Sequence, residues 1–225
     1  LKKGTVLTAA DVATLSRSLK VVTVARLEAG DVGEDAAATA LAGALVPDPG
    51  AQGLALTRAF TGRVNLNAAG PGIVEIDVAA TGNPVVQAEG RLWGGNLAML
   101  CHLVGTRWMP EVEGGILFLE DVNEHPYRVE RMLLQLAHAG ILARQQAVVL
   151  GDFSGYRLGE FDNGYDFPVM LDYLRGRLGL PVLQGLPFGH IRDKLTLPVG
   201  ADCRLHSDAA GFSLRLSGYP VLASG

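Results

Sequence analysis

Two segments of the sequence place acid–base side chains directly after apolar runs. The run Gly114–Leu119 (GGILFL) has the length and composition of a buried strand, and Glu120 is the first polar residue after it. Open α/β sheets bind their ligands where the strands end, at the carboxyl edge. His190 lies in a glycine- and proline-rich loop (GLPFGH) that follows a predicted strand at Pro181–Gln184. An imidazole and a carboxylate at neighbouring strand ends suit general acid–base chemistry, in which the histidine moves a proton and the glutamate orients it.

Each of these positions also has a purely structural interpretation, which the sequence leaves open. Asp121 and Glu124 share the loop of Glu120, and both are well placed to charge the start of the helix predicted from Pro126. His190 is equally consistent with a half-exposed loop histidine. Spacing alone does not decide between a catalytic pair and ordinary loop side chains.

Other charged residues give weaker signals. Arg192 and Lys194 come next in the histidine loop, and either contact with a substrate carboxylate or plain surface charge fits their position. His102, His138 and His206 have no partner at the spacing of a metal site, so we expect solvated or core roles for them. We therefore predict neither a metal nor a cofactor.

A nucleophile is the part of such a catalytic group that the sequence does not supply. Ser154 and Ser207 lie in plausible loops, yet neither stands in the strand–turn–helix elbow of the G-x-S-x-G kind that exposes a catalytic serine. Cys101 is embedded in the apolar run LAMLCHL and is predicted to be a buried structural thiol. Cys101 and Cys203 form no C-x-x-C pair, so neither a disulfide scaffold nor a zinc site is indicated.

The elements that must position these side chains are those of an α/β fold. High glycine content, 29 residues, favours tight strand-to-helix turns, and strands that alternate with helices favour a partly parallel sheet. Short alternating runs near the end predict an antiparallel meander. We expect a mixed sheet with flanking helices, plus a small N-terminal α/β segment. The expected helices are 8–15, 34–45, 126–139 and 167–178, and the expected strands are 20–27, 73–77, 114–119, 147–153, 181–184, 194–199, 203–205 and 212–216.

The composition excludes several classes of protein. A chain of 225 residues with 48% apolar and 19% charged residues is typical of a globular protein rather than a disordered one. Its net charge of −4 comes without a long run of one sign, and no apolar stretch reaches the roughly 18 residues of a membrane helix. We therefore expect a soluble, cytoplasmic protein that binds neither nucleic acid nor a membrane.

Four motifs in the later part of the chain resemble one known family. They are GRLWGGNLAMLCHLVGT (Gly90–Thr106), ILFLEDVNEHPYRVERML (Ile116–Leu133), VLGDF (Val149–Phe153) and LPFGHIRDKLTLPVGA (Leu186–Ala201). They are similar to the C-terminal domain of the LD-carboxypeptidases, serine peptidases that remove the terminal D-alanine from muropeptides. The resemblance implies that Glu120 and His190 are triad members and that the nucleophilic serine belongs to a preceding domain, which this sequence does not show. The implied partner is a small, muropeptide-like substrate, and a homodimer is the assembly considered.

The first part of the chain resembles a different family. Its motifs are KKGTVLTAADVATL, VTVARLEAGDVGEDAAATALAGAL and FTGRVNLNAAGPGIVEID. They are similar to the opening of the molybdopterin-binding domains fused to molybdenum-cofactor nucleotidyltransferases. Composition changes at Ala79–Pro84 (AATGNP), which predicts a molybdopterin-binding-like fragment over 1–82 and an LD-carboxypeptidase-like domain over 83–225. A chain that joins two families in this way is most simply a chimera or a recombined fragment.

Three functional hypotheses follow from these patterns. The first is an LD-carboxypeptidase-type domain for the hydrolysis of muropeptide L,D-amides in peptidoglycan recycling, inactive alone because its serine is missing. The second is a non-enzymatic chimera or interaction module, in which the joined segments were kept because they pack. The third is molybdopterin binding by the first segment.

Overall fold

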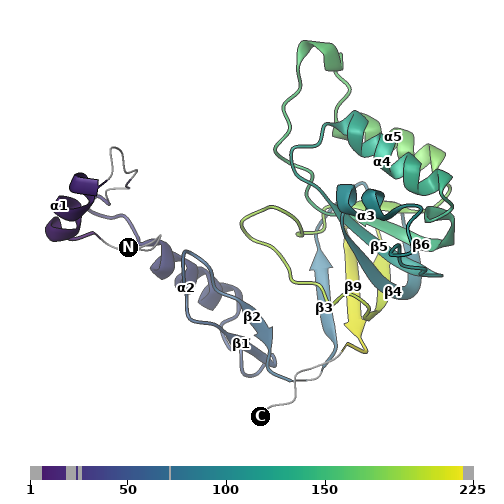
Figure 1. The fold of residues 1–225 in the computed structure, drawn as a ribbon. Coiled ribbons are helices and arrows are strands. Elements are labelled where there is room, and N and C mark those ends of the chain that lie inside the picture. The colour runs from purple at the N-terminus through teal and green to yellow at the C-terminus, as the bar shows by residue number, and fades with distance from the viewer. Residues whose placement is uncertain (1–6, 19–23, 25–26, 71, 220–225) are drawn as a thin grey trace. The chain divides into compact units, whose positions relative to one another are not determined.

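The computed structural model describes residues 7–18, 24, 27–70 and 72–219 (Figure 1). The chain forms two compact units, Leu1–Gly72 and Ile73–Gly225. This division lies ten residues before the predicted boundary at 82, because strand β3 (Val74–Val78) pairs with a strand near the end of the chain and so belongs to the second unit. Most of the strand expected at 20–27 lies outside the described residues.

The described part of the first unit contains two helices and a small antiparallel sheet. Helix α1, predicted over 8–15, begins with a capping box: Thr8 Oγ1 accepts a hydrogen bond from Asp11 N at 3.2 Å, and Asp11 Oδ2 accepts one from Thr8 N at 2.9 Å. The alanine-rich segment forms a helix, as predicted. The elements are α1 (Ala9–Ser18), α2 (Glu34–Leu45), β1 (Leu54–Leu56) and β2 (Leu66–Ala68).

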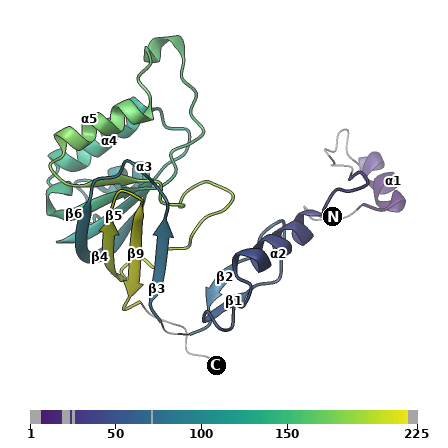
Figure 2. The same cartoon turned by 180° about the vertical axis from the view of Figure 1, so that it is seen from behind.

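The second unit is built on a seven-stranded mixed sheet with the strand order β3-β9-β8-β4-β5-β6-β7 (Figures 1 and 2). Strands β4 to β7 pair in parallel, and β8, β9 and β3 continue the sheet in antiparallel pairs. The predicted mixed sheet with flanking helices is therefore confirmed. Its further elements are β4 (Val86–Asn96), α3 (Leu97–Leu103), β5 (Gly115–Glu120), α4 (Pro126–His138), β6 (Gln145–Leu150), α5 (Phe167–Arg177), β7 (Val182–Gln184), β8 (Asp202–Ser207) and β9 (Phe212–Ser217).

Strand β4 joins the two halves of this sheet. Residues 86–91 pair antiparallel with β8, and residues 92–96 pair in parallel with β5. Glycine permits the close approach to β5, since a Cβ at Gly94 would lie only 1.8 Å from a carbonyl oxygen of that strand. The parallel register sets Asn96, the last residue of β4, beside Glu120, the last residue of β5.

The core of the second unit lies on both faces of the central strands. Strand β5 is buried along its whole length, as its apolar run predicts. On one face, Leu117 and Leu119 belong to a cluster with Leu133 of α4; Figures 1 and 2 show α4 and α5 side by side there. On the other face, Ile116 and Phe118 pack with side chains of the antiparallel strands. This two-sided packing fixes the carboxyl ends of the strands, where the candidate residues lie.

The segment 79–84, where the change in composition predicted the boundary, is bonded to the second unit. The side chain of Asn83 donates to Gln184 O at 3.0 Å and accepts from Gln184 N at 2.8 Å. The amide of Asn83 thus makes the two hydrogen bonds that the backbone of a further strand would make beside β7. Arg175 of α5 donates to Asn83 Oδ1 at 3.0 Å. Because β3 and β7 are the two edges of the sheet, this segment runs from one edge to the other.

Two local predictions were incomplete or wrong. The run 194–199 alternates like a strand but is a loop, in which Leu195 N bonds to Pro187 O at 2.8 Å and Leu197 is buried. The segment 86–103, which forms β4 and α3, was not assigned from the sequence. Among the helices of the described chain, none combines the length and the apolar character that a membrane span requires.

Candidate functional site

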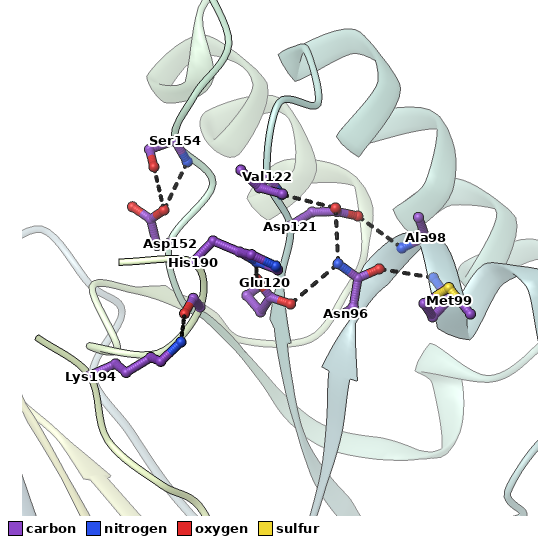
Figure 3. Close-up of polar contacts among 11 residues, drawn as sticks. Asn96, Ala98, Met99, Glu120, Asp121, Val122, Asp152, Ser154, His190 and Lys194 are labelled. Atoms are coloured by element: carbon purple, nitrogen blue, oxygen red, sulfur yellow. Dashed lines mark hydrogen bonds and ion pairs between the residues drawn. The ribbon is translucent and has the colours of Figure 1, made fainter. Parts of the chain in front are cut away.

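Glu120 and His190 meet at the carboxyl edge of the parallel strands (Figure 3). Glu120 ends β5, and His190 lies in the loop after β7. His190 Nδ1 and Glu120 Oε2 are 2.8 Å apart, which is a direct hydrogen bond. The glutamate side chain is 7% exposed and the histidine side chain is 55% exposed. The expected approach of these two residues at one sheet edge is confirmed.

This hydrogen bond determines what the imidazole can do. A carboxylate oxygen only accepts, so Nδ1 carries the hydrogen and the second ring nitrogen, Nε2, keeps its lone pair. In the described part of the chain, Nε2 of His190 has no hydrogen-bond partner. A buried carboxylate at Nδ1 also stabilises the imidazolium that forms when Nε2 takes up a proton. The geometry is that of a general base with its orienting carboxylate.

The backbone before His190 requires glycine. Gly189 has φ +133°, and a Cβ there would lie 3.2 Å from Glu120 Oε2 and 3.2 Å from the Cβ of Asp152. Lys194 Nζ donates to the carbonyl of Gly189 at 3.1 Å, so this lysine ties down the histidine loop. Arg192 is exposed in the same loop. Contact of Arg192 or Lys194 with a substrate carboxylate stays a prediction.

Asn96 and Asp121 also belong to the site, and the sequence did not single them out as partners of the Glu120–His190 pair. Asn96 Nδ2 donates to Glu120 Oε1 at 3.2 Å and to Asp121 Oδ1 at 3.0 Å. Asp121 was interpreted as a helix-start charge for α4, but its carboxylate is buried and bonds to the start of α3, through Ala98 N at 2.9 Å. The signal that was available is the polar Asn96 at the end of the apolar and glycine-rich RLWGGN run.

None of the nucleophile candidates among the described residues is bonded to His190. Ser154 Oγ donates to Asp152 Oδ2 at 2.5 Å, and Figure 3 shows this pair apart from the imidazole. Ser207 is fully buried within β8. Burial, with the charge of Asp121 as a second cause, raises the pKa of the Cys101 thiol to about 11, which suppresses the reactive thiolate.

The remaining polar residues of the loop after β5 point to separate partners. Glu124 pairs with Arg128, one turn along α4, at 3.6 Å. His125 Nδ1 lies 3.4 Å from Asp162 Oδ1, on the loop before α5. Across the described chain, no three His, Cys, Asp or Glu side chains come together in a group that could hold a metal ion. The site is therefore centred on the Glu120–His190 pair.

The fold and the pair define a class of protein, an α/β domain with a histidine–carboxylate pair at the carboxyl edge of its parallel strands. Residues 89–205, just over half of the chain, match the LD-carboxypeptidase C-terminal domain. The chain belongs to this family through that domain, and both Glu120 and His190 lie within the matched range. Residues 1–72 lie outside the match, so the molybdopterin-binding resemblance and the chimera stay predictions.

Named relatives agree with this family. A putative carboxypeptidase of Synechocystis is 40% identical over 126 residues, 56% of this chain and 42% of that protein. A probable murein peptide carboxypeptidase of Bacillus subtilis is 31% identical over 54% of this chain and 38% of its own length. The crystal structure of muramoyltetrapeptide carboxypeptidase from Oxalobacter formigenes superposes with a TM-score of 0.65 at 56% identity, over 66% of this chain and 51% of that one. The chain thus spans about two fifths of these curated relatives and half of that crystal structure.

Proposed function

We propose that residues 73–219 supply the general base and its orienting carboxylate for an LD-carboxypeptidase active site. The observation that carries the proposal is the 2.8 Å hydrogen bond from His190 Nδ1 to the buried Glu120, in a histidine side chain that is 55% exposed. The substrate class is a muropeptide with a terminal D-amino acid in an L,D-amide. It is supported by the names of the relatives from Bacillus subtilis and Oxalobacter formigenes.

In the proposed mechanism, His190 accepts a proton and then donates it, once when the acyl-enzyme forms and once when it is hydrolysed. A serine hydroxyl from another segment of polypeptide attacks the amide carbonyl, and His190 Nε2 accepts the hydroxyl proton. Glu120 stabilises the imidazolium through Nδ1–H. The imidazolium then protonates the leaving amine, the C–N bond breaks and an acyl-enzyme remains. Water then gives a proton to His190 Nε2 and attacks this ester. The imidazolium returns that proton to the serine oxygen as the C–O bond breaks, which releases the shortened peptide and restores the serine hydroxyl.

The 225-residue chain is proposed to be inactive on its own. Within the described residues, no serine or cysteine bonds to His190, and a general base without a nucleophile lacks the covalent step. Removal of one triad member typically costs about 10⁴ to 10⁶ in rate, since the members act as a unit. We expect no release of D-alanine from an L,D-linked tetrapeptide by the chain alone and no labelling by a fluorophosphonate.

The positive test is a hybrid enzyme. The matching half of the Oxalobacter formigenes enzyme is replaced by this chain's residues 73–219, which the high identity of the two proteins makes feasible. The hybrid should release D-alanine, and His190→Ala should lower kcat by roughly 10³ or more. His206→Ala is the matched control, because His206 is an exposed histidine on β8 that contacts Gln87 and not the site. A folded hybrid without turnover, or one that His190→Ala leaves active, contradicts the proposal.

The two alternative functions predict different results for the same chain. An interaction module or a folded chimera gives a hybrid without turnover. A molybdopterin-binding segment gives a rise in thermal stability when molybdopterin is added, because a ligand that binds only the folded state stabilises it. We propose neither as the main function, because the acid–base pair lies in the unit that matches the peptidase family.

A further inference from the structure

One amide side chain lies between two buried carboxylates beneath the acid–base pair (Figure 3). Asn96 Nδ2 donates to Glu120 Oε1 at 3.2 Å and to Asp121 Oδ1 at 3.0 Å. Glu120 and Asp121 are each only 5% exposed as whole residues, so water supplies few of the hydrogen bonds of their carboxylates. A buried carboxylate requires protein donors in place of water. The single NH₂ group of Asn96 supplies one donor to each of them.

The orientation of the Asn96 amide is fixed by its other end. Asn96 is the N-cap of α3, and its Oδ1 accepts a hydrogen bond from Met99 N at 3.1 Å. A flipped amide would turn the oxygen toward both carboxylates and the NH₂ group toward a backbone donor. Every one of those contacts would be repulsive, so only one orientation satisfies all the groups.

Asp121 anchors this amide and does not compete for the histidine. Its Oδ2 accepts from Ala98 N at 2.9 Å, and its Oδ1 accepts from Val122 N at 2.9 Å as well as from Asn96. With three donors, the carboxylate is held to the backbone of two elements. One N–H of Asn96 is therefore committed to Asp121, and the other points at Glu120.

We infer that Asn96 is a positioning residue that selects which oxygen of Glu120 faces His190. Asn96 holds Oε1, so Oε2 is the oxygen directed at His190 Nδ1, and the plane of the carboxylate is fixed. The imidazole is thereby kept in the tautomer with hydrogen on Nδ1 and the lone pair on Nε2. This inference rests on the proposed function, because that tautomer matters only if His190 acts as the base.

The test variant is Asn96→Asp, which keeps the shape of the side chain and an acceptor for Met99 N but replaces the donor by a third carboxylate. Asn96→Ser, a second variant, also keeps a capping oxygen and removes the NH₂ group. Asn83→Ala is the matched control, since it also removes an asparagine with several hydrogen bonds but lies beside β7, bonded to Gln184 and Arg175.

The readout is the imidazole of His190 in the ¹⁵N-labelled chain, recorded by long-range ¹H–¹⁵N correlation at a pH where the ring is neutral. We expect the Nδ1–H tautomer in the unaltered chain and in Asn83→Ala. Asn96→Asp and Asn96→Ser should shift His190 toward the Nε2–H form while tryptophan fluorescence still reports a folded second unit. If Asn96→Asp is not folded, Asn96→Ser decides. An unchanged Nδ1–H tautomer in a folded Asn96 variant, or the same shift in Asn83→Ala, would overturn the inference.

The hybrid enzyme separates this inference from the proposed function. There, Asn96→Asp should lower kcat by roughly 10², within the range that a general base contributes, and leave KM nearly unchanged. An inactive hybrid whose isolated chain still shows the Asn96-dependent tautomer contradicts the proposed function alone. An active hybrid whose tautomer and kcat do not respond to Asn96→Asp contradicts the positioning role alone.

Discussion

Each of the two units of this chain is stabilised internally by a different kind of interaction. In the second unit, β5 and most of β6 are buried, and two clusters of aliphatic side chains fill both faces of the sheet. In the described part of the first unit, the buried apolar residues are Ala38, Ala42 and Val46, while larger side chains such as Leu41 and Leu45 are exposed. The second unit is a packed domain, and the first depends on helix propensity, capping and short turns.

This difference accounts for the place of the candidate site in the second unit. A general base needs a carboxylate held in a fixed direction and shielded from water, and such a carboxylate requires a packed core beneath it. Glu120 has this support, because it ends a buried strand. In the first unit, Asp11 and Asp31 each bond to a backbone N–H three residues away, and Asp31 is exposed while Asp11 is half-buried.

The largest expected effect compares one leucine from each unit. Leu133 of α4 is 0% exposed, so Leu133→Ala should lower the free energy of unfolding by about 2–5 kcal/mol through lost burial and a cavity. Leu41 of α2 is 48% exposed, and Leu41→Ala should change it by less than about 0.5 kcal/mol. Urea unfolding followed by tryptophan fluorescence measures the first effect, because Trp93 and Trp108 both lie in the second unit. Equal losses for the two variants would remove the distinction between the units.

A second comparison concerns side-chain hydrogen bonds. Asn83→Ala removes bonds to Gln184 and Arg175 that tie the segment between the sheet edges, and roughly 2–3 kcal/mol should be lost. Thr8→Ala removes half of an exposed capping box in the first unit and should cost about 1 kcal/mol of local helix stability. Urea unfolding followed by tryptophan fluorescence should detect only the loss of stability in Asn83→Ala. Far-ultraviolet circular dichroism should detect a small loss of helix for the second.

A third comparison separates backbone strain from damage to the site. Gly189→Ala places a methyl group at positive φ and against Glu120 Oε2, so it should cost about 1–3 kcal/mol and disrupt the bond to His190. Gly164 also has positive φ, +77°, but a Cβ added there would meet no atom within 4 Å, so Gly164→Ala should cost about 1 kcal/mol and leave the pair intact. Thermal unfolding and the His190 imidazole spectrum check the two parts. Identical spectra in the two variants would show that Gly189 has no special role.

The last prediction is a pH dependence, above pH 9, of the second unit, where both cysteines lie. Burial raises the pKa of Cys101 to about 11 and that of Cys203 to about 12, from an ordinary value of 9.0. A raised pKa in the folded state means that the contribution of each thiol to stability is full below pH 9.0 and is lost as pH rises toward 11 and 12. At about pH 8, iodoacetamide should label neither thiol quickly until urea unfolds the unit. Rapid labelling of the folded chain would contradict this burial.

The sequence was sufficient to predict an element where its local hydrophobic pattern agrees with the packing in the folded domain. The run GGILFL and the apolar spacing of α4 each have one favourable packing arrangement, so β5 and α4 were predicted nearly to the residue. The sequence placed Glu120 and His190 at strand ends, but it was the resemblance to the LD-carboxypeptidase domain that implied their pairing. The 2.8 Å hydrogen bond confirms that the two residues meet.

The sequence was insufficient where a contact depends on distant backbone. The run 194–199 alternates like a strand, but the backbone N–H of Leu195 bonds to Pro187 O in a loop and not to a strand of the sheet. One half of strand β4 pairs antiparallel with β8 and the other half pairs in parallel with β5. Its mixture of charged residues and glycines therefore lacks the alternation of apolar and polar residues that indicates a strand. The role of Asn96 depends on the β4–β5 register, which no local pattern records.

The hydrogen position on His190 tests the central claim most directly, because the proposed chemistry requires a lone pair on Nε2. The measurement is the ¹⁵N imidazole spectrum of the intact chain and of Glu120→Ala at a pH where the ring is neutral. The structure predicts Nδ1–H in the intact chain and a shift toward Nε2–H in a folded Glu120→Ala variant. An Nε2–H tautomer in the intact chain, or a spectrum that does not respond to the loss of Glu120, would contradict the account.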